Sequence, residues 1–417
     1  MGMTMSEKIL AAHAGQPSVK PGDTVTCKVD WGVCHDMFFN VDGQDIYKNV
    51  THLDHPEKCV IMIDHAVLAP TTRDAQGAVY AREFCKKHNI VNFFDVGDHA
   101  VIHQLLVERS FAAPGKLIAG GDSHTCAAGA LNCAARGFGP ADMTYVLCTG
   151  ETWYQVVPTI LYKLTGKLPE GCSGKDVFLY IAGVYGDVTG MTVEFGGEGV
   201  AGLTISQRQS IATMCAEINA EFAVFPCDDR ATGFLKARGD KEIIPVEPDQ
   251  NAEYYDVREV DLSKLEPYVA KPHFIPKNCV PVKEAEGLPI QQIVVGSCSN
   301  GRIEDLQTVA DILKGKHIAP GVRVIVTPAS QRIYLEAVKN GIVETLAEAG
   351  CVVTNASCGC CYGGHMGLIG SGERCLATTT RNFKGRLGSP DSEVMLCGPA
   401  TAAASALKGV ITDPRKI

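Results

Sequence analysis

The chain has 417 residues, of which 46% are hydrophobic and 20% charged, and its formal net charge is −9. A chain of this length needs more than one core, so we expect three packed units in a fully globular protein. The acidic balance and the lack of a Lys/Arg-rich run argue against a nucleic-acid partner, and the lack of a leader or a long apolar stretch argues against secretion or a membrane partner.

The 18 cysteines are scattered through this long chain. In a small secreted domain such a number would indicate disulfides, but here we expect free thiols in a reducing, cytoplasmic location. Most of them are interpreted as small buried hydrophobic residues, so any functional thiols must be identified by their spacing.

Short apolar runs rich in β-branched residues predict buried strands at residues 59–63, 116–119 and 292–295. Helical patterns fall between and beyond them, at residues 77–88, 208–222 and 331–349. Alternating strands and helices predict the α/β fold class.

Proline and glycine content suggests where the units divide. Seven of the 21 prolines lie in residues 245–290, which indicates an extended crossing segment. We therefore predict α/β units at residues 1–170, 171–284 and 285–417, with the Pro-rich linker at 245–284.

Polar residues gather where the predicted strands end. Asp64-His65 follows the first strand, Gly-Asp-Ser-His-Thr at 121–125 the second, and Gly-Ser-Cys-Ser-Asn at 296–300 the third. Open α/β sheets bind ligands at the carboxyl ends of their strands, so these segments are candidates for one site.

One constellation of cysteines stands out: Cys298 in GSCSNGR, with Cys358 and Cys361 in SCGCCYGG. A structural zinc site or an electron-transfer cluster normally uses four protein ligands, whereas three thiolates leave one iron open. The neighbouring glycines let the backbone approach a cluster closely. A thioredoxin-like reading of the Cys-x-x-Cys pair is the competitor, and Cys360 is interpreted as a bystander.

A family resemblance rests on seven segments in order: DHAVLAPT, VIHQLLVE, GGDSHTCAAGALNCAARGFGPADM, VVGSCSNGR, SCGCCYGGHMG, GERCLATTTRNFKGRLGSP and PATAAASALKG. They resemble the segments that define the large-subunit members of the aconitase family. The start EKILAAHAG and the compact length are similar to the isopropylmalate dehydratase and homoaconitase branch. The resemblance implies three α/β domains around a [4Fe-4S] cluster, without the family's swivel domain.

The same resemblance implies roles for individual residues. Cys298, Cys358 and Cys361 are expected to hold the cluster, whose fourth iron binds substrate and water. The catalytic residues are expected in three pairs of a histidine with a carboxylate: Asp64 with His65, His103 with Asp122, and His124 with Glu194. Histidines oriented by carboxylates suit proton transfer to a departing hydroxyl.

Two arginines of TRNFKGR, Arg381 and Arg386, offer forked donors suited to a substrate carboxylate. Ser123 matches a family active-site serine and is a second substrate-binding candidate, with a turn or cap role as the alternative. The chain departs from the family at Thr380, where an Asn is usual. The motif CHDMFF, with His35-Asp36, is also divergent and receives no assigned role.

We expect a hydro-lyase that dehydrates and rehydrates a hydroxy di- or tricarboxylate, with 2-isopropylmalate as the leading substrate. Homoaconitate, dimethylmalate, methylmalate and maleate-type hydratases are alternatives, because they share the cluster motifs. An iron-sensing RNA-binding protein and a four-thiolate electron carrier are alternatives from other classes. No GSSR-like motif occurs in the sequence, so the resemblance implies a small swivel-domain subunit that supplies the catalytic serine and a substrate-binding arginine.

Overall fold

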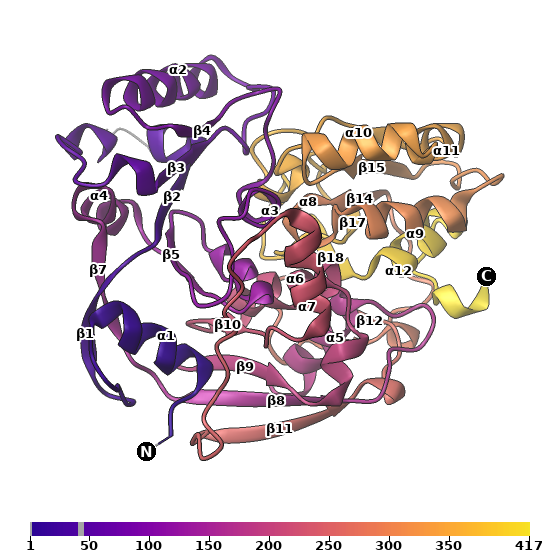
Figure 1. Ribbon diagram of the computed structural model, residues 1–417. Helices are drawn as coiled ribbons and strands as arrows, with labels where there is room; N and C mark the ends of the chain where they lie inside the picture. The colour runs from indigo at the N-terminus through magenta and orange to yellow at the C-terminus, as the bar shows by residue number, and fades with distance from the viewer. Residues whose placement is uncertain (1, 41–45) are drawn as a thin grey trace.

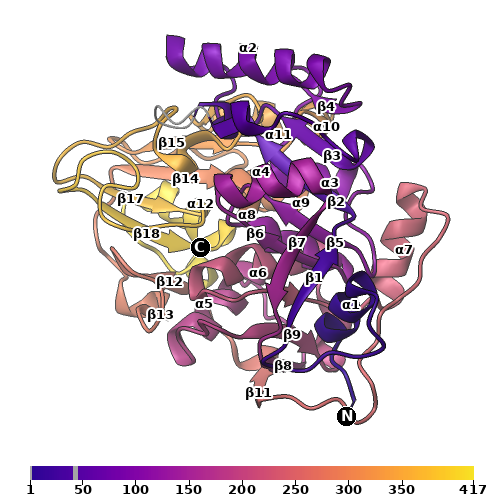
Figure 2. The ribbon, with the colours of Figure 1, turned by 90° about the vertical axis from the view of Figure 1, so that its left-hand side faces the viewer.

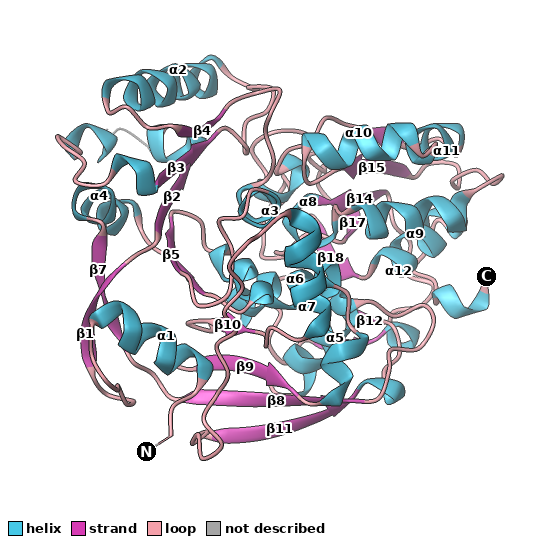
Figure 3. Ribbon diagram, viewed as in Figure 1, coloured by secondary structure: helices cyan, strands magenta, loops and turns pink. Residues whose placement is uncertain are grey.

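A computed structural model describes residues 2–40 and 46–417 of the chain. The three largest sheets have five, four and seven strands in chain order, and helices lie beside each of them (Figure 1). Figure 3 shows how strands and helices alternate through most of the chain, and the predicted α/β class is confirmed. Within the described ranges, no helix combines the length and apolarity needed to cross a membrane.

The first sheet has the strand order β4-β3-β2-β5-β6, and all of its neighbours are parallel. Every residue of β3 is buried, as expected for a parallel sheet covered on both faces. The antiparallel ribbon of β1 and β7 runs beside it (Figure 2). The elements of this region are α1 (Met5–Ala14), β1 (Thr24–Lys28), β2 (Trp31–His35), β3 (Cys59–Met62), α2 (Thr72–Lys87), β4 (Asn92–Phe94), α3 (Ile102–Glu108), β5 (Leu117–Gly120), β6 (Ala134–Gly137), α4 (Pro140–Thr149) and β7 (Glu151–Gln155).

The second sheet is also parallel, in the order β10-β9-β8-β11, and it lies at the bottom of Figure 1. Helix α5 begins at a capping box, in which the Asp176 carboxylate accepts from the Ser173 amide and fixes the start of the helix. The elements are β8 (Thr159–Thr165), α5 (Gly174–Val184), β9 (Thr192–Gly196), α6 (Ile205–Met214), β10 (Ala223–Val224), α7 (Asp229–Arg238) and β11 (Asp256–Asp261).

The third sheet has the order β13-β12-β18-β17-β14-β15-β16. Its strands from β18 to β16 are parallel, and β12 and β13 add an antiparallel edge. The elements are β12 (Tyr268–Ala270), β13 (Cys279–Pro281), β14 (Gln292–Gly296), α8 (Ser297–Asn300), α9 (Ile303–Leu313), β15 (Arg323–Thr327), α10 (Gln331–Lys339), α11 (Ile342–Glu348), β16 (Val352–Val353), β17 (Arg374–Ala377), β18 (Glu393–Cys397) and α12 (Pro399–Lys408).

Short 3₁₀ turns connect many of these elements, and several of them carry or adjoin polar motifs. These turns are η1 (Asp36–Phe39), η2 (Ile46–Asn49), η3 (Pro56–Lys58), η4 (Thr125–Leu131), η5 (Glu198–Gly202), η6 (Cys215–Ile218), η7 (Leu262–Lys264), η8 (Val282–Glu284), η9 (Gly359–Tyr362) and η10 (Pro414–Lys416).

Two of the predicted helices differ from those observed. The helix expected over residues 208–222 ends as α6 at Met214, continues as the turn η6 and stops at Asn219, whose φ is +61°. The helix expected over 331–349 is divided into α10 and α11 by Gly341, whose φ is +72°. In both places a residue in the left-handed region ends the helical path. The three predicted strands are confirmed as β3, β5 and β14.

The chain passes from the second sheet to the third within the Pro-rich segment. Strand β11 pairs with β8 in the second sheet, and β12 pairs with β18 in the third. The predicted divisions at residues 170 and 284 stay predictions, because strand pairing groups the strands without dividing the chain into units.

Candidate active site

A cavity of about 240 Å³ lies between residues of the first-sheet and third-sheet regions. Every sequence-predicted site residue lines it except Asp64 and Glu194. The lining consists of Met37, His65, Val101, His103, Asp122, Ser123, His124, Cys298, Cys358, Cys361, Tyr362, Arg381 and Arg386. His65 comes soon after β3, Asp122 after β5 and Cys298 after β14, so the carboxyl ends of parallel strands do converge on one site.

The first cysteine is held by a strained turn at the end of β14. Gly296 has a φ of +135°, and a Cβ there would lie 2.0 Å from the Thr327 carbonyl oxygen, so only glycine fits. The hydroxyl of Ser297 lies 3.9 Å from the sulfur of Cys298 and 3.9 Å from that of Cys358. Backbone packing therefore brings the lone thiol to the Cys-x-x-Cys turn.

The other two thiols occupy the turn η9. The interaction between the Cys358 and Cys361 side chains chiefly holds the pKa of Cys361 well below its ordinary value and raises the pKa of Cys358. Thr380 Oγ1 lies 3.3 Å from the Cys361 sulfur, and Arg386 Nη2 lies 4.0 Å from it. Cys360, by contrast, is packed in an apolar core.

His65 lies among three carboxylates. Its Nδ1 donates to Asp64 Oδ1 at 2.6 Å, its Nε2 lies 3.5 Å from Asp122 Oδ2, and Asp36 Oδ1 is 3.7 Å from Nδ1. Burial lowers the pKa of His65, but these carboxylates outweigh burial and raise that pKa well above its ordinary value. His65 is therefore a protonated imidazolium at neutral pH.

The divergent pair His35-Asp36 contacts both the ring and the backbone of His65. The ring of His35 stacks on that of His65, with centroids 4.2 Å apart and planes 25° apart. The Asp36 carboxylate accepts from the backbone amides of His65 (3.2 Å) and Ala66 (2.8 Å). Although burial raises the pKa of Asp36, its histidine neighbours hold that pKa well below the usual range, so Asp36 is ionised.

Asp122 connects the histidines of the site. Its Oδ1 lies 3.0 Å from His103 Nε2 and accepts from the His124 amide at 2.7 Å. Burial raises the pKa of Asp122, but the surrounding histidines hold it well below its usual range. Burial lowers the pKa of His103, and Asp122 opposes this shift only in part. Two of the histidines whose rings lie near Asp122 thus differ: the pKa of His65 is raised, which favours its charged form, and that of His103 is lowered, which favours its neutral form.

The partner predicted for His124 is corrected by the structure. His124 Nε2 binds Glu217 Oε1 at 2.7 Å, not Glu194. Glu194 is fully buried on β9, where it accepts from the amide and hydroxyl of Ser6 and from Tyr254. The reason is that α6 ends early, and the following turn η6 directs Glu217 toward the cavity. Glu194 instead anchors the start of α1.

The anion-binding candidates lie on the same side as Glu217. Arg381 Nε donates to Glu217 Oε1 at 2.8 Å, and its Nη2 donates to Ser123 Oγ at 2.9 Å. Arg386 lies over the ring of Phe383, and its buried Nε has no hydrogen-bond partner within the described part of the chain. Ser123, Arg381 and Arg386 thus present donors along one wall of the cavity.

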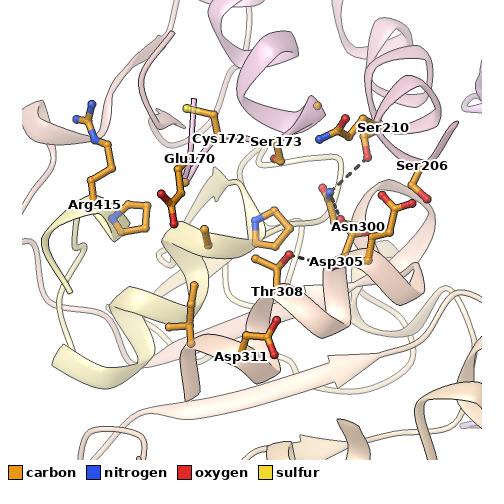
Figure 4. Close-up of a pocket in the computed structure, with 18 of the residues that line it drawn as sticks. Glu170, Cys172, Ser173, Ser206, Ser210, Asn300, Asp305, Thr308, Asp311 and Arg415 are labelled. Carbon is orange, nitrogen blue, oxygen red and sulfur yellow. Dashed lines mark hydrogen bonds between the residues drawn. The ribbon is translucent and has the colours of Figure 1, made fainter. Parts of the chain in front are cut away.

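A larger cavity of about 660 Å³ lies on the other side of the Cys298 turn (Figure 4). In it Asn300 Nδ2 donates to Asp305 Oδ1 at 2.9 Å and to Ser210 Oγ at 3.3 Å. Ser210 Oγ in turn donates to the Ser299 carbonyl at 2.6 Å. This polar network supports the Cys298 turn from behind and contains none of the predicted site residues.

Four lining or contacting residues were missed by sequence reasoning: Glu217, Met37, Val101 and Tyr362. Met37 belongs to the divergent CHDMFF motif and Tyr362 directly follows Cys361, so their neighbours could have indicated them. Glu217 had only a weak signal, because it is one of two glutamates among several polar residues in the predicted helix over 208–222.

The chain matches known proteins along its whole length. The model described as "Aconitase family (aconitate hydratase)" matches residues 8–288 and 282–409. The chain is 48% identical over 417 residues to the 3-isopropylmalate dehydratase large subunit of Mycolicibacterium smegmatis, covering 100% of this chain and 98% of that protein. It is 42% identical over 421 residues to the protein of the same name from Moorella thermoacetica, with 100% of both chains covered.

A third relative is 3-isopropylmalate dehydratase large subunit 1 of Methanopyrus kandleri, which is 43% identical over 418 residues, covering 100% of this chain and 99% of that protein. Among solved structures, the chain resembles Thermococcus kodakaraensis aconitase X in its holo-form, with a TM-score of 0.52, 10% identity and 88% of each chain covered. At that identity the likeness shows the fold alone.

Proposed function

The chain belongs to the aconitase family, and we propose that it works as the large subunit of a hydro-lyase that carries a [4Fe-4S] cluster. Its proposed substrate is 2-isopropylmalate, which the reaction converts into 3-isopropylmalate through the alkene. The observation that carries the proposal is that three thiols and a histidine bonded to a carboxylate line one cavity. The names of the full-length relatives support the choice of substrate.

The residues present fit the cluster. Cys298, Cys358 and Cys361 all line the cavity, and glycines beside them allow close backbone approach. At Gly363, whose φ is +74°, a Cβ would lie 2.0 Å from the Arg386 carbonyl oxygen, so the turn needs glycine there. Three thiolate donors leave one iron without a protein sulfur, and that iron would supply Lewis acidity to the hydroxyl that departs.

His65 is the proposed proton donor to the departing hydroxyl. Its imidazolium is held by Asp64 and faces the cavity, so it has both the proton and the access that a general acid needs. Asp122, ionised and shared by the histidines, keeps their rings in place. His103 and His124, each bonded to a carboxylate, are proposed to orient the substrate beside it.

The substrate carboxylates are proposed to bind Arg381, Arg386 and Ser123. The unpaired Nε of Arg386 is a donor that a carboxylate would satisfy. Arg381 is already oriented by Glu217, so its position is fixed before substrate binds.

We propose that a small subunit completes the site. It would supply a serine as the base for the carbon-bound proton, and an arginine that reads the substrate. The words "large subunit" in the names of the relatives support a smaller partner. A cover over the cavity would also exclude water and strengthen the electrostatic interactions inside.

The test is turnover after anaerobic reconstitution with iron and sulfide. We expect hydration of the alkene and conversion of 2-isopropylmalate only when the co-encoded small subunit is added. A panel of homoaconitate, dimethylmalate, methylmalate and maleate in the same assay measures the neighbouring specificities. Full activity of the large chain alone would contradict the two-subunit proposal, and preference for another substrate would replace 2-isopropylmalate.

A further inference from the structure

Lys175 is a buried charge that the proposed mechanism does not use. It is the second residue of α5, and its side chain is 0% exposed. Its Nζ donates to the carbonyls of Thr379 (2.6 Å) and Thr378 (3.1 Å) and to Ser299 Oγ (3.0 Å), and lies 3.2 Å from Met214 Sδ. Every hydrogen-bond partner of this ammonium is therefore neutral.

No carboxylate balances this charge. Within the described ranges, no Asp or Glu oxygen lies within 4.0 Å of Lys175 Nζ. The next residue, Asp176, is turned away to accept from the amides of Ser173 and Tyr268. Ser173 and Gly174 line the cavity of Figure 4, but the full burial of Lys175 excludes hydration from that side. A buried, unpaired ammonium is costly, so a structure that retains one is expected to provide a countercharge.

The partners of Lys175 lead to two of the cluster-binding thiols. Ser299 directly follows Cys298, and Thr378 and Thr379 precede Thr380, whose hydroxyl lies 3.3 Å from the Cys361 sulfur. The ammonium thus ties together the two loops that would enclose the cluster. Burial lowers the pKa of Lys175 to about 8, and the groups that oppose this are the thiols Cys397, Cys298 and Cys361 and, last, Glu217.

Other buried cations nearby already have partners. Arg302 donates to the carbonyls of Cys298 and Ser299 and has Asp305 at 4.0 Å. Arg381 is paired with Glu217. Arg386 likewise has no carboxylate partner within the described residues, but it lines the cavity and is proposed to bind substrate. Lys175 differs from it in being fully buried behind the thiols.

We propose that Lys175 is the internal counter-cation of the thiolate-bound cluster. The inference rests on the proposed function, because it requires a cluster on Cys298, Cys358 and Cys361. A cluster with a doubly positive core and three thiolates carries a net negative charge, which would balance the ammonium. Lys175 is then a positioning residue: it stabilises the bound cluster and raises its reduction potential without touching the substrate.

The test compares Lys175→Met, which removes the charge at similar length, with Lys175→Arg, which keeps it. The matched control is Lys163→Met, on β8 of the second sheet, where the side chain is half exposed and pairs with Glu259. All are measured as the full chain, without the cluster and after anaerobic reconstitution. The readouts are the midpoint potential of the cluster by EPR-monitored titration, cluster retention during chelation, and the thermal midpoint of each form.

For Lys175→Met we expect a more negative midpoint potential and about 10- to 100-fold weaker cluster retention, with Lys175→Arg and the control close to wild type. The cluster-free form should be at least as stable as wild type, because an unpaired buried charge has been removed. An unchanged potential, or a cluster-free Lys175→Met protein less stable than wild type, would overturn the proposal. Wild-type protein that loads no cluster would instead refute the proposed function.

Discussion

The cavity has two sides that are organised differently. On the histidine side, in the region of the first sheet, every histidine has a carboxylate partner. His65, His103 and His124 each bind a carboxylate, and Asp122 contacts all three residues. The cysteine side, from the third sheet, consists of buried thiols. Burial raises the pKa of Cys298, whereas the pKa of Cys361 is held well below its ordinary value chiefly by Cys358, so the three thiols do not ionise alike.

This difference suggests how the site is assembled. Interlocked charges of opposite sign can hold the histidine side in place in the cluster-free protein. The cysteine side gathers cations behind its sulfurs, and Cys298 and Cys358, whose pKa values are raised, lose their protons when they bind iron. We infer that the first side is preorganised by the protein and that the second is completed by the cluster. The predictions below test that division.

The largest expected effect comes from removing one cluster ligand on the cysteine side. Cys298→Ser should abolish the visible absorbance of the cluster and all measurable turnover, because a hydroxyl is a poor replacement for a thiolate ligand to iron. Cys360→Ser is the matched control, since Cys360 faces the core, and it should retain the cluster. Titration of His65 by NMR should be unchanged in Cys298→Ser. A collapsed His65 resonance would contradict the independence of the two sides.

The second prediction removes the acid from the histidine side. His65→Asn should lower turnover by about 10²- to 10⁴-fold, the usual contribution of a general acid. Iron and sulfide content should stay at the wild-type level, because His65 contacts carboxylates rather than the thiols. Parallel loss of iron and turnover would indicate that His65 has a structural role on both sides.

The third prediction separates the carboxylate that the structure places in the site from the one predicted by sequence. Glu217→Gln should reduce kcat/KM by about 10- to 100-fold, since it weakens charge-assisted hydrogen bonds to His124 and Arg381. Glu194→Gln should leave kcat/KM near wild type and change thermal stability instead, because Glu194 holds Ser6 at the start of α1. The reverse pattern would restore Glu194 as the catalytic partner.

The sequence predicted the parts of the site that depend on local chemistry. Asp64-His65, Asp122 and Cys298 follow strands directly, so strand prediction alone located them. Glu217 could not be predicted, because its position depends on where α6 ends. Residues 215–222 continue a helical pattern, and only Asn219, with its φ of +61°, stops it. Lys175 was equally hidden, since its role depends on how α5 packs against loops of the third sheet.

The smallest expected effect concerns the divergent pair behind His65. Asp36 is ionised and lies 3.7 Å from His65 Nδ1, so it helps to raise the pKa of that histidine. As a general acid His65 must be protonated, so activity is present below its raised pKa and is lost as the pH rises through it. Asp36→Asn removes one negative charge and should lower that pKa. The alkaline limb of the kcat profile should therefore move to lower pH.

The size of the effect at the optimum should be modest. Asparagine keeps one acceptor for the Ala66 amide, so turnover should fall by roughly fivefold or less, equivalent to about 1 kcal/mol. Asp54→Asn, at a side chain that is 57% exposed, makes the same change in net charge far from the site and should leave the alkaline limb in place. An unmoved limb in Asp36→Asn would mean that Asp64 and Asp122 alone hold the proton on His65. The raised pKa of His65 would then depend on two carboxylates rather than three.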